Sequence, residues 1–470
     1  MLTMLNKLII QRSGEEPPPL EAVSPLVVFF KQDIVAACLL LVSALAALII
    51  ANSPAAEWYH GLWHTHFGFS FGDFTLDLTL HHWINDGLMA VFFFVVGLEI
   101  KRELLVGELA SFRKAMLPAV AAVGGMVFPA LIYTALNFGT HTSRGWGIPM
   151  ATDIAFAMGC LAMLGGRVPQ AIGVFLVALA IVDDLGSVVV IAVFYTEKLA
   201  TRPLLVGTSL IMLSYGLNRI GVRQIFPYVV IGAIVWFEFL ESGVHATIAG
   251  VLGAFTIPAT ARYETPHFFG RMSTLLQRFT DAEDYVNPLL VNARQQQLVR
   301  SILRECHHVE APLQRLEHAL HPVCVTIILP LFAFASSGVT LDVSELSVIL
   351  TQSVTLGVFF GLVVGKQTGI MVMSWIAVKS GLAELPKGIG WKHIYGLSWL
   401  AGIGFTMALF INELAFKAGP GIDPELMAAH VDETKIGVIL ASTLCGLVGY
   451  LFLRRVCASN PAEVDPLSRH

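Results

Sequence analysis

Two adjacent aspartates lie in the middle of a long apolar stretch. Asp183 and Asp184 follow the run 178–182 and precede Leu185 and Gly186. A charged side chain at the centre of a membrane helix costs about 2.5–3.5 kcal/mol, so such residues are functional candidates. Neighbours on a helix point about 100° apart, so one carboxylate can face a water-filled cavity while the other contacts a partner. Because carboxylate oxygens bind both protons and hard cations, the pair predicts competition between protons and a cation. A purely structural pair of buried acids is the alternative.

One lysine, Lys366, also lies inside an apolar stretch, between Gly365 and Gln367. A buried ammonium needs an anion to offset its loss of hydration. Asp183 or Asp184 is the natural partner. The alternative is a lysine close to the end of a membrane span, whose ammonium reaches the interface along its apolar stem.

Asp153 closes the segment 147–153, which also contains Gly147, Pro149 and Thr152. Proline interrupts a membrane helix and frees backbone carbonyls. The segment 401–406 is a second interruption of this kind, with Gly402 and Gly404. Interrupted helices in corresponding halves of a membrane protein indicate an ion site near the bilayer midplane. Asp153 is expected to neutralise the positive amino-terminal ends of the half-helices, and simple helix capping is compatible with that role.

The composition is that of a membrane protein rather than a soluble one. Of the 470 residues, 55% are hydrophobic and 13% are charged, whereas soluble domains carry about 25% charged residues. The net charge of −5 gives no basic surface for nucleic acid. Since a span needs about 20 mainly apolar residues, we predict an all-α polytopic membrane protein of about twelve transmembrane helices. The expected spans are 34–52, 84–103, 115–137, 147–165, 169–195, 203–217, 225–240, 243–258, 318–338, 348–376, 393–416 and 434–453.

The distribution of basic residues orients these spans. The loops 53–83, 241–242 and 339–347 contain no Lys or Arg, while Arg113 and Arg454 are among the many basic residues of the opposite side. Cytoplasmic loops carry the excess of Lys and Arg, so both termini are predicted to be cytoplasmic. The predicted segments are a cytoplasmic amino-terminal segment 1–33, spans 1–8 in 34–258, a cytoplasmic loop 259–317, spans 9–12 in 318–455, and a cytoplasmic tail 456–470.

Two segments outside the spans have patterns of their own. In 67–80, apolar residues alternate with small or polar ones on both sides of Gly72-Asp73, which predicts a small periplasmic β-hairpin. An isolated hairpin is marginal in water, so it either pairs with a second protomer through its edge or lies on its own membrane domain. In 259–317, apolar residues have the spacing of surface helices, namely Val299, Ile302, Leu303, Leu313 and Leu316.

The motifs around these residues resemble those of the bacterial NhaA-type sodium/proton antiporters, from roughly residue 30 to 455. The matching motifs are Asn85–Met89, Gly97–Leu104, Ala151–Phe156, Asp183–Gly186, Gly243–Thr247, Leu316–His318, Leu331–Ala335 and Gly402–Met407.

The resemblance implies inverted repeats formed by spans 3–5 and 10–12, with spans 4 and 11 broken and crossing at the ion site. Asp184 is then the principal carboxylate for Na⁺ and protons, Asp183 the partner of Lys366, and Asp153 with Thr152 the support of the site. The resemblance further implies electrogenic exchange of two protons for one Na⁺, activity with Li⁺ and regulation by pH. The expected location is the bacterial inner membrane, and the exposed edge of the hairpin 67–80 predicts a homodimer. Residues that match positions linked to the pH response are Glu99, Arg102, Glu103, His245, Glu317 and His318. For His245 a purely structural role is an equal alternative.

Two departures and three rival functions remain at this stage. Ser336-Ser337 stands where the family pattern has Asn-Ala, and the 259–317 loop is long. A proton-coupled symporter of an organic solute would want a larger polar or aromatic pocket, and a cation channel would want a ring of acids. An intramembrane hydrolase lacks its motif, since no span contains Gly-x-Ser-x-Gly or His-Glu-x-x-His. The expectation is a transporter that is not an enzyme and needs no cofactor.

Overall fold

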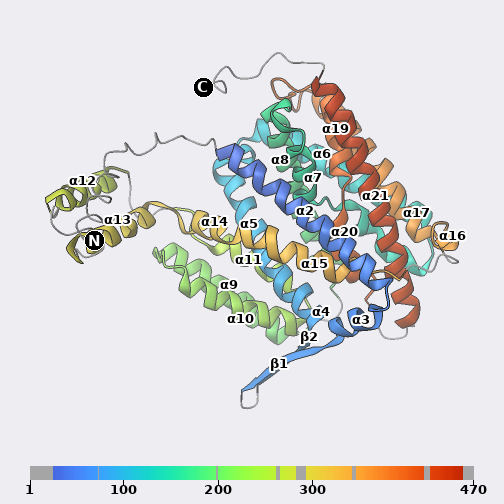
Figure 1. Ribbon diagram of the computed structural model, residues 1–470, viewed down its shortest axis with the longest axis horizontal. Helices are drawn as coiled ribbons and strands as arrows, with labels where there is room; N and C mark the ends of the chain where they lie inside the picture. Colours follow the sequence, from blue (N-terminus) through green and yellow to red (C-terminus); the bar gives the residue numbers. More distant parts are fainter. Residues whose placement is uncertain are drawn as a thin grey trace, which may run out of the picture.

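The protein is a bundle of long helices with a thin hairpin projecting from one end, as the computed structural model shows (Figure 1). The structure describes residues 25–71, 74–196, 199–260, 265–281, 293–340, 346–417 and 424–458. The elements of the first half are α2 (Pro25–Ala51), α3 (Ala56–His64), β1 (His66–Phe71), β2 (Phe74–Thr79), α4 (Leu80–His82), α5 (Met89–Val106), α6 (Phe112–Leu136), α7 (Ile154–Ala162), α8 (Gln170–Phe194), α9 (Thr201–Ile220), α10 (Phe226–Ser242) and α11 (Ala246–Thr256).

The second half continues the bundle after two peripheral helices. Its elements are α12 (Thr265–Asp281), α13 (Ala293–Val309), α14 (Pro312–Val323), α15 (Leu329–Ser336), α16 (Leu346–Ile349), α17 (Ser353–Phe360), α18 (Lys366–Lys379), α19 (Trp391–Ala401), α20 (Phe405–Ala415) and α21 (Pro424–Ala458). Turns of π-helix join α4 to α5, α14 to α15 and α17 to α18, so each of these pairs forms one continuous span. A π-helical turn adds a residue to the helix and shifts the faces on either side of it.

Seven helices within the described ranges are long and apolar enough to cross a membrane, and the bent pair of α19 and α20 makes an eighth. The predicted all-helical membrane fold is therefore confirmed. The other four predicted spans also coincide with helix, in α9, α10, α11 and the interrupted segment that ends in α7. These four are shorter, less apolar or broken.

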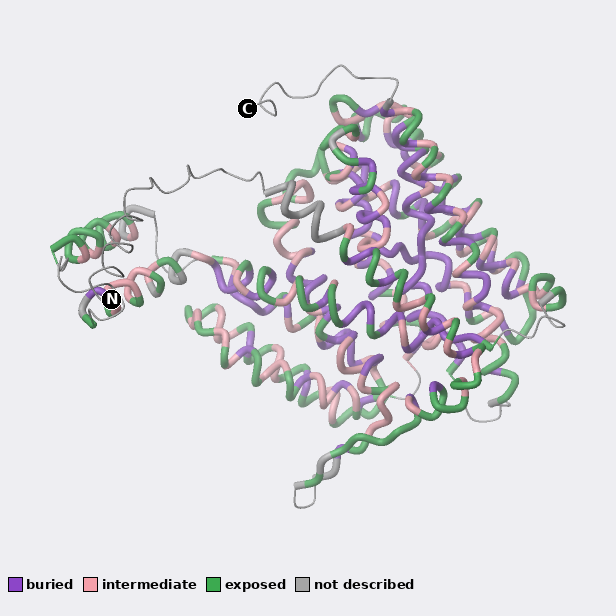
Figure 2. Tube along the Cα trace, in the orientation of Figure 1, coloured by how far each residue is buried: buried purple, intermediate pink, exposed green. Residues whose placement is uncertain are grey.

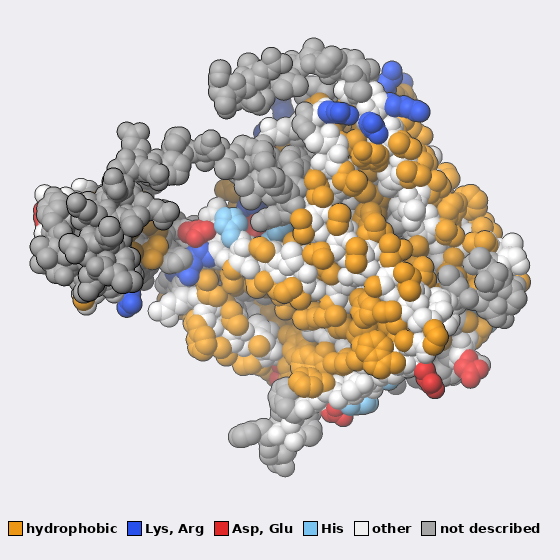
Figure 3. Space-filling model, viewed as in Figure 1, with side chains coloured by type: hydrophobic (Ala, Val, Ile, Leu, Met, Phe, Trp, Pro, Cys, Tyr) orange, Lys and Arg blue, Asp and Glu red, His pale blue; other side chains and the backbone are white. Residues whose placement is uncertain are grey.

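The surface divides into two polar ends and an apolar belt. Hydrophobic side chains cover the middle of the bundle, Lys and Arg gather where α21 ends, and acidic side chains gather near the hairpin (Figure 3). We call these the basic end, with Arg113, Lys114 and Arg454, and the hairpin end. Buried residues run through the centre of the bundle, along α20 and the facing helices (Figure 2). Exposed apolar residues over a whole belt are what a bilayer requires of the surface that contacts lipid.

Helices α6 and α18 cross so closely that glycine is needed on both. A Cβ at Gly124 would lie 2.2 Å from the carbonyl oxygen of Gly369, and one at Gly369 would lie 2.1 Å from that of Gly124. Small residues permit such approaches between membrane helices. Residues 112–194 form a long span (α6), a broken span and a second long span (α8). Residues 353–458 repeat this order with α17/α18, a broken span and α21. The two units agree with the expected repeats.

The hairpin is confirmed, with Phe67 opposite Leu78 and Phe71 opposite Phe74. Its turn, 72–73, lies outside the described residues. The Nε1–H of Trp83 donates to the carbonyl of Phe67 at 2.8 Å, which ties the base of the hairpin to the bundle. Beyond that base the strands project away from the helices (Figure 1), so the hairpin does not lie along its own membrane domain.

The helical spacing in 259–317 is also confirmed. Val299, Ile302 and Leu303 lie on α13, whereas Leu313 and Leu316 are buried on α14, which begins the span Pro312–Ser336 and is not a surface helix. Helices α12 and α13 pack on each other and stand apart from the bundle (Figure 1). Residues 261–264 and 282–292 of this loop lie outside the described ranges.

Candidate functional site

Two broken spans cross in the centre of the bundle. The first has extended backbone at 151–153 before α7, and the second is interrupted between α19 and α20, which bend by 47°. The breaks touch directly, because the backbone N–H of Asp153 donates to the carbonyl of Ile403 at 2.7 Å. A Cβ at Gly404 would lie 3.2 Å from the carbonyl oxygen of Ala151, so glycine lets the two backbones approach. Backbone groups freed by the interruptions thus bind each other inside the protein, as the membrane interior requires.

Asp153 joins the amino-terminal ends of both half-helices. One carboxylate oxygen, Oδ1, accepts the N–H of Phe156 in α7 at 3.0 Å. The other, Oδ2, accepts the backbone N–H of Thr406 at 3.0 Å and its hydroxyl at 2.5 Å, both from α20. Since helix amino termini carry partial positive charge, one buried carboxylate stabilises two of them. The sequence left helix capping and charge neutralisation as compatible roles for Asp153. In the structure the same contacts of its carboxylate perform both roles.

Lys366 contacts Asp183 and Thr152. Its Nζ lies 2.7 Å from Oδ2 of Asp183 and 2.8 Å from the hydroxyl oxygen of Thr152. Both side chains of the ion pair are 0% exposed. The Thr152 hydroxyl donates to the carbonyl of Ala401 at 2.8 Å, at the carboxyl-terminal end of α19. The lysine is therefore fully buried and paired, and the alternative in which it reaches the interface is wrong.

Asp184, unlike Asp183, does not form an ion pair with Lys366. It is 2% exposed, and its Oδ1 has no hydrogen-bond partner among the described residues. It lies within electrostatic range of Asp183, Glu99 and Asp153. Because an isolated buried carboxylate is strongly unfavourable, this oxygen calls for a proton or a cation. The two adjacent aspartates thus have different surroundings, as their angular separation on α8 predicted.

A cavity of about 380 Å³ lies among α5, α7, α8 and α14 on the basic-end side of the crossing, and Asp184 itself does not line it. Its inner wall includes Ile154 and Ala155, next to Asp153, and Ile181, one helical turn before Asp184. Its polar lining consists of Glu99, Arg102, Glu317, His318 and His321. The cavity therefore ends within one turn of α8 from Asp184.

The polar residues at the mouth form three contact groups. Arg102 contacts Glu317 at 2.5 Å and Glu103 at 3.2 Å, while Glu99 lies 3.8 Å from Nε2 of His321. His318, which also lines the cavity and is largely exposed, contacts Glu310 at 3.3 Å. The structure therefore gathers Glu99, Arg102, Glu103, Glu317 and His318 near one opening.

His245 is not part of that group. It lies at the opposite end of the bundle, before α11, and its Nε2 is 3.0 Å from the carbonyl of Tyr195. Tyr195 in turn accepts the N–H of Gly147 and donates to the carbonyl of Arg144. His245 thus ties α11 to the segment before the first break, which favours the structural alternative for this residue.

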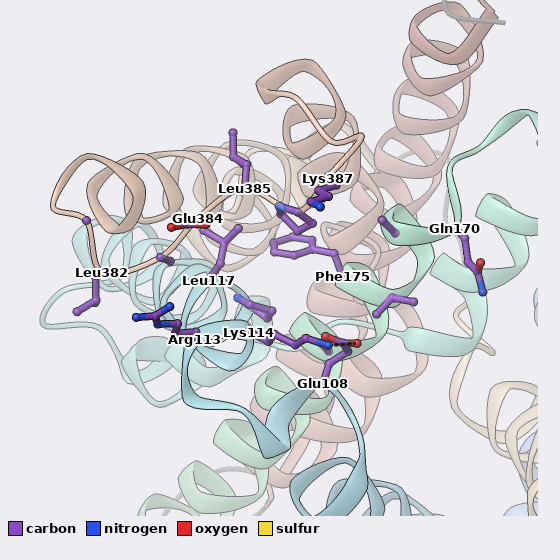
Figure 4. A pocket seen from close by; sticks show the side chains of 17 residues that line it. Glu108, Arg113, Lys114, Leu117, Gln170, Phe175, Leu382, Glu384, Leu385 and Lys387 are labelled. Atoms are coloured by element: carbon purple, nitrogen blue, oxygen red, sulfur yellow. Dashed lines mark hydrogen bonds and ion pairs between the residues drawn. The ribbon is translucent and has the colours of Figure 1, made fainter. Parts of the chain in front are cut away.

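A larger cavity, of about 730 Å³, lies elsewhere at the basic end (Figure 4). Arg113, Lys114, Glu108 and Lys387 line it, and Lys114 contacts Glu108 at 3.2 Å. None of the residues in the crossing lines it. Size alone therefore does not identify the ion site.

Two polar groups in the site were not among the predicted site residues. Thr406 belongs to the quoted motif at 402–407, but its contact with Asp153 depends on how the spans cross. His321 lies one turn after Glu317 and His318 on the same helix, and that spacing was a signal that could have found it.

Comparisons with known proteins agree with these observations. The family model described as Na+/H+ antiporter 1 matches residues 28–453. The Na+/H+ antiporter NhaA 1 of Saccharophagus degradans is 48% identical, over 92% of this chain and 92% of its own length. The antiporter NhaA of Oleidesulfovibrio alaskensis is 47% identical, over 96% of this chain and 98% of its own. A solved sodium proton antiporter of Methanocaldococcus jannaschii covers 92% of this chain and 98% of its own, at 11% identity and a TM-score of 0.45, a likeness too distant to bear on the site.

Proposed function

Because the chain belongs to the Na+/H+ antiporter 1 family, we propose that it exports Na⁺ in exchange for protons at Asp184. The observation that carries the proposal is the buried oxygen of Asp184, which has no partner among the described residues and belongs to the helical turn that follows the cavity wall at Ile181. Asp183 is neutralised by Lys366, so Asp184 is the carboxylate free to take either ion. Competition between two ions for one site couples their movements.

The exchange follows from alternating access. Protons from outside protonate the acids and displace Na⁺ to the medium, and cytoplasmic Na⁺ then displaces protons inward. Asp153 supports this cycle because it bonds both half-helices at the crossing, where small movements of either span reach the ion. With two protons moving inward for each Na⁺, one net charge crosses the membrane per cycle. Li⁺, a smaller hard cation with the same preference for oxygen ligands, is transported as well.

The polar cluster at the mouth provides the pH response in this proposal. Glu99, Arg102, Glu103, Glu317 and His318 lie near the cytoplasmic opening, and their charge acts on ions entering the cavity. Low pH suppresses transport for a simpler reason as well, since Na⁺ cannot compete for carboxylates that hold protons.

The orientation and assembly are proposed on the same basis. Arg and Lys side chains gather at the basic end, which supports a cytoplasmic position for that end and for both termini in a bacterial inner membrane. The hairpin then projects into the periplasm, where the free edge of β1 or β2 can pair with the hairpin of a second copy.

Purified protein in liposomes with an entrapped pH dye tests the function. A pH gradient is imposed, and Na⁺, Li⁺, K⁺ or choline is added over a range of pH. The expected result is dissipation of the gradient by Na⁺ and Li⁺ alone, absent in Asp184→Asn and retained in Glu57→Gln, an exposed acid remote from the crossing. A voltage-sensitive dye reports the net charge movement. No cation response at any pH would contradict antiport and favour the solute symporter.

A further inference from the structure

A second buried acid lies on the hairpin side of the crossing. Glu413 belongs to α20, and its side chain is only 10% exposed. It contacts Nε2 of His81 at 3.4 Å, and it accepts a hydrogen bond from the amide of Asn85. The Ser336 hydroxyl lies beside the same carboxylate, yet it makes no hydrogen bond of acceptable geometry to any described residue. An ionisable group at this depth is a functional candidate with His81 as its named partner.

One face of α20 connects this acid to the ion site. Thr406, Phe410 and Glu413 are spaced at i, i+4 and i+7, so they project from the same side of the helix. Thr406 bonds Asp153, and Glu413 follows about 10 Å farther along the axis. The face therefore runs from the crossing toward the hairpin end.

Aromatic rings lie between Glu413 and the ion site at the crossing. Phe410 is 1% exposed, and its ring lies 5.4 Å from that of Phe93 and 6.1 Å from that of Phe332. These three buried rings pack together, and we call them the aromatic seal. The cavity on the other side of the crossing opens toward the basic end. Glu413 thus lies just outside the seal that separates the ion site from the hairpin end.

Of the two residues in the His81–Glu413 pair, His81 is the more exposed to solvent. The side chain of His81 is 37% exposed against 10% for Glu413, so the imidazole meets external water first. We propose that His81 and Glu413 form a proton-entry relay at the hairpin end of the transport path. The proposal rests on the antiport function and on the periplasmic position of that end.

The transfer is a simple proton exchange. A hydronium ion gives a proton to the His81 imidazole, and the imidazolium passes one proton from Nε2 to the Glu413 carboxylate. The neutral carboxylic acid passes the proton on when the Phe410 seal opens and Asp184 becomes accessible. The positive charge of His81 and of Lys435 from α21 favours the ionised form of Glu413, so the carboxylic acid is a short-lived carrier of the proton.

The other charged groups around the pair are also defined. The Asp86 carboxylate, in the π-helical turn before α5, interacts electrostatically with His81. The neighbouring imidazole of His82 also interacts electrostatically with His81. Lys435 contacts Asp432 at 3.3 Å. Tyr59 of α3 lies within electrostatic range of Glu413, and its hydroxyl donates to the carbonyl of Phe334. Burial raises the pKa of Tyr59 to about 12, so the phenol stays neutral in any transport assay.

Right-side-out vesicles loaded with labelled Na⁺ test the relay, since only the outer face then meets the external buffer. Efflux is started by external acid over a series of pH values. Glu413→Gln and His81→Gln are expected to need roughly tenfold more external protons for half-maximal efflux, as loss of a positioned proton carrier slows transfer. At acidic external pH they should reach the unaltered maximal rate. External imidazole should restore the rate at higher pH, Glu413→Asp should stay within about twofold of the unaltered protein, and the dependence on internal Na⁺ should not change.

Two results would overturn the relay. One is an external-pH profile of Glu413→Gln equal to that of Glu57→Gln, the same charge change on the exposed face of α3. The other is a loss by one constant factor at every pH that imidazole does not rescue, which is the signature of a structural contact. Absence of Na⁺/H⁺ exchange in the unaltered chain would instead refute the antiport function, and it is recognised before any variant is compared.

Discussion

Replacing Lys366 by Met should destabilise the protein strongly while leaving its shape intact. Methionine has a similar length, but it removes the ammonium that lies 2.7 Å from Asp183 and 2.8 Å from the Thr152 hydroxyl. Both members of the ion pair are 0% exposed, so water cannot replace the lost partner. Removing one member of a buried pair costs about 3–5 kcal/mol, because the other charge remains buried without compensation.

The double variant separates this effect from simple loss of packing. Asp183→Asn combined with Lys366→Met removes both charges, so the penalty of an uncompensated carboxylate disappears. We expect the two changes to be coupled by about 1–3 kcal/mol, with the double variant more stable than the sum of the single effects predicts. The free energy of unfolding in mixed micelles, followed by tryptophan fluorescence, gives each corner of the cycle.

Lys379→Met is the matched control, since this lysine lies at the end of the same helix, with its ammonium 4.4 Å from the centre of the Trp375 ring. It should lose no more than about 1 kcal/mol. A Lys366→Met protein as stable as the control, or a cycle without coupling, would refute the reasoning that a buried ion pair fixes α18 to the crossing.

Three further changes test other parts of the account. Gly124→Ala should cost about 1–3 kcal/mol of unfolding free energy because its Cβ meets the Gly369 carbonyl, whereas Gly216→Ala, with nothing within 4 Å, should be neutral or stabilising; equal effects would contradict the close crossing. Thr406→Val should cost about 1–3 kcal/mol by removing a buried donor to Asp153, and Thr368→Val, whose hydroxyl bonds only its own helix, should cost less in the same unfolding assay. Glu317→Gln should shift the pH of half-maximal antiport by about half a unit, since a partly exposed pair with Arg102 is worth up to about 1 kcal/mol. Glu108→Gln, whose ion pair with Lys114 does not line the smaller cavity, should leave the liposome pH profile in place.

Local patterns predicted the elements of this fold, and tertiary contacts decided the rest. The apolar windows located the helices, and the alternation around 72–73 located the hairpin, because both signals depend only on neighbouring residues. The partner of Lys366 was open between Asp183 and Asp184 on residue chemistry alone, since the rotation of α8 is set by its neighbours. Glu413 was not predicted as a site residue because it lies near the end of a predicted span, where an exposed acid is expected. The residue is nevertheless buried, because α15 and α21 pack around α20.

The structure also locates Ser336-Ser337, the pair that departs from the family pattern. Both residues are 0% exposed at the end of α15, and neither hydroxyl has a hydrogen-bond partner in the described chain. Ser336 lies beside Glu413. The sequence difference therefore falls in the polar cluster outside the aromatic seal and not in the ion site, a distinction that sequence comparison alone could not make.

Na⁺ binding to the purified protein, measured by calorimetry at a series of pH values, tests the central claim most directly. If Na⁺ and protons compete for Asp184, the apparent dissociation constant should rise as the pH falls, by up to about tenfold per pH unit for each proton displaced. Binding heat should vanish in Asp184→Asn. Na⁺ binding of unchanged affinity at every pH, or binding that survives in Asp184→Asn, would contradict the account.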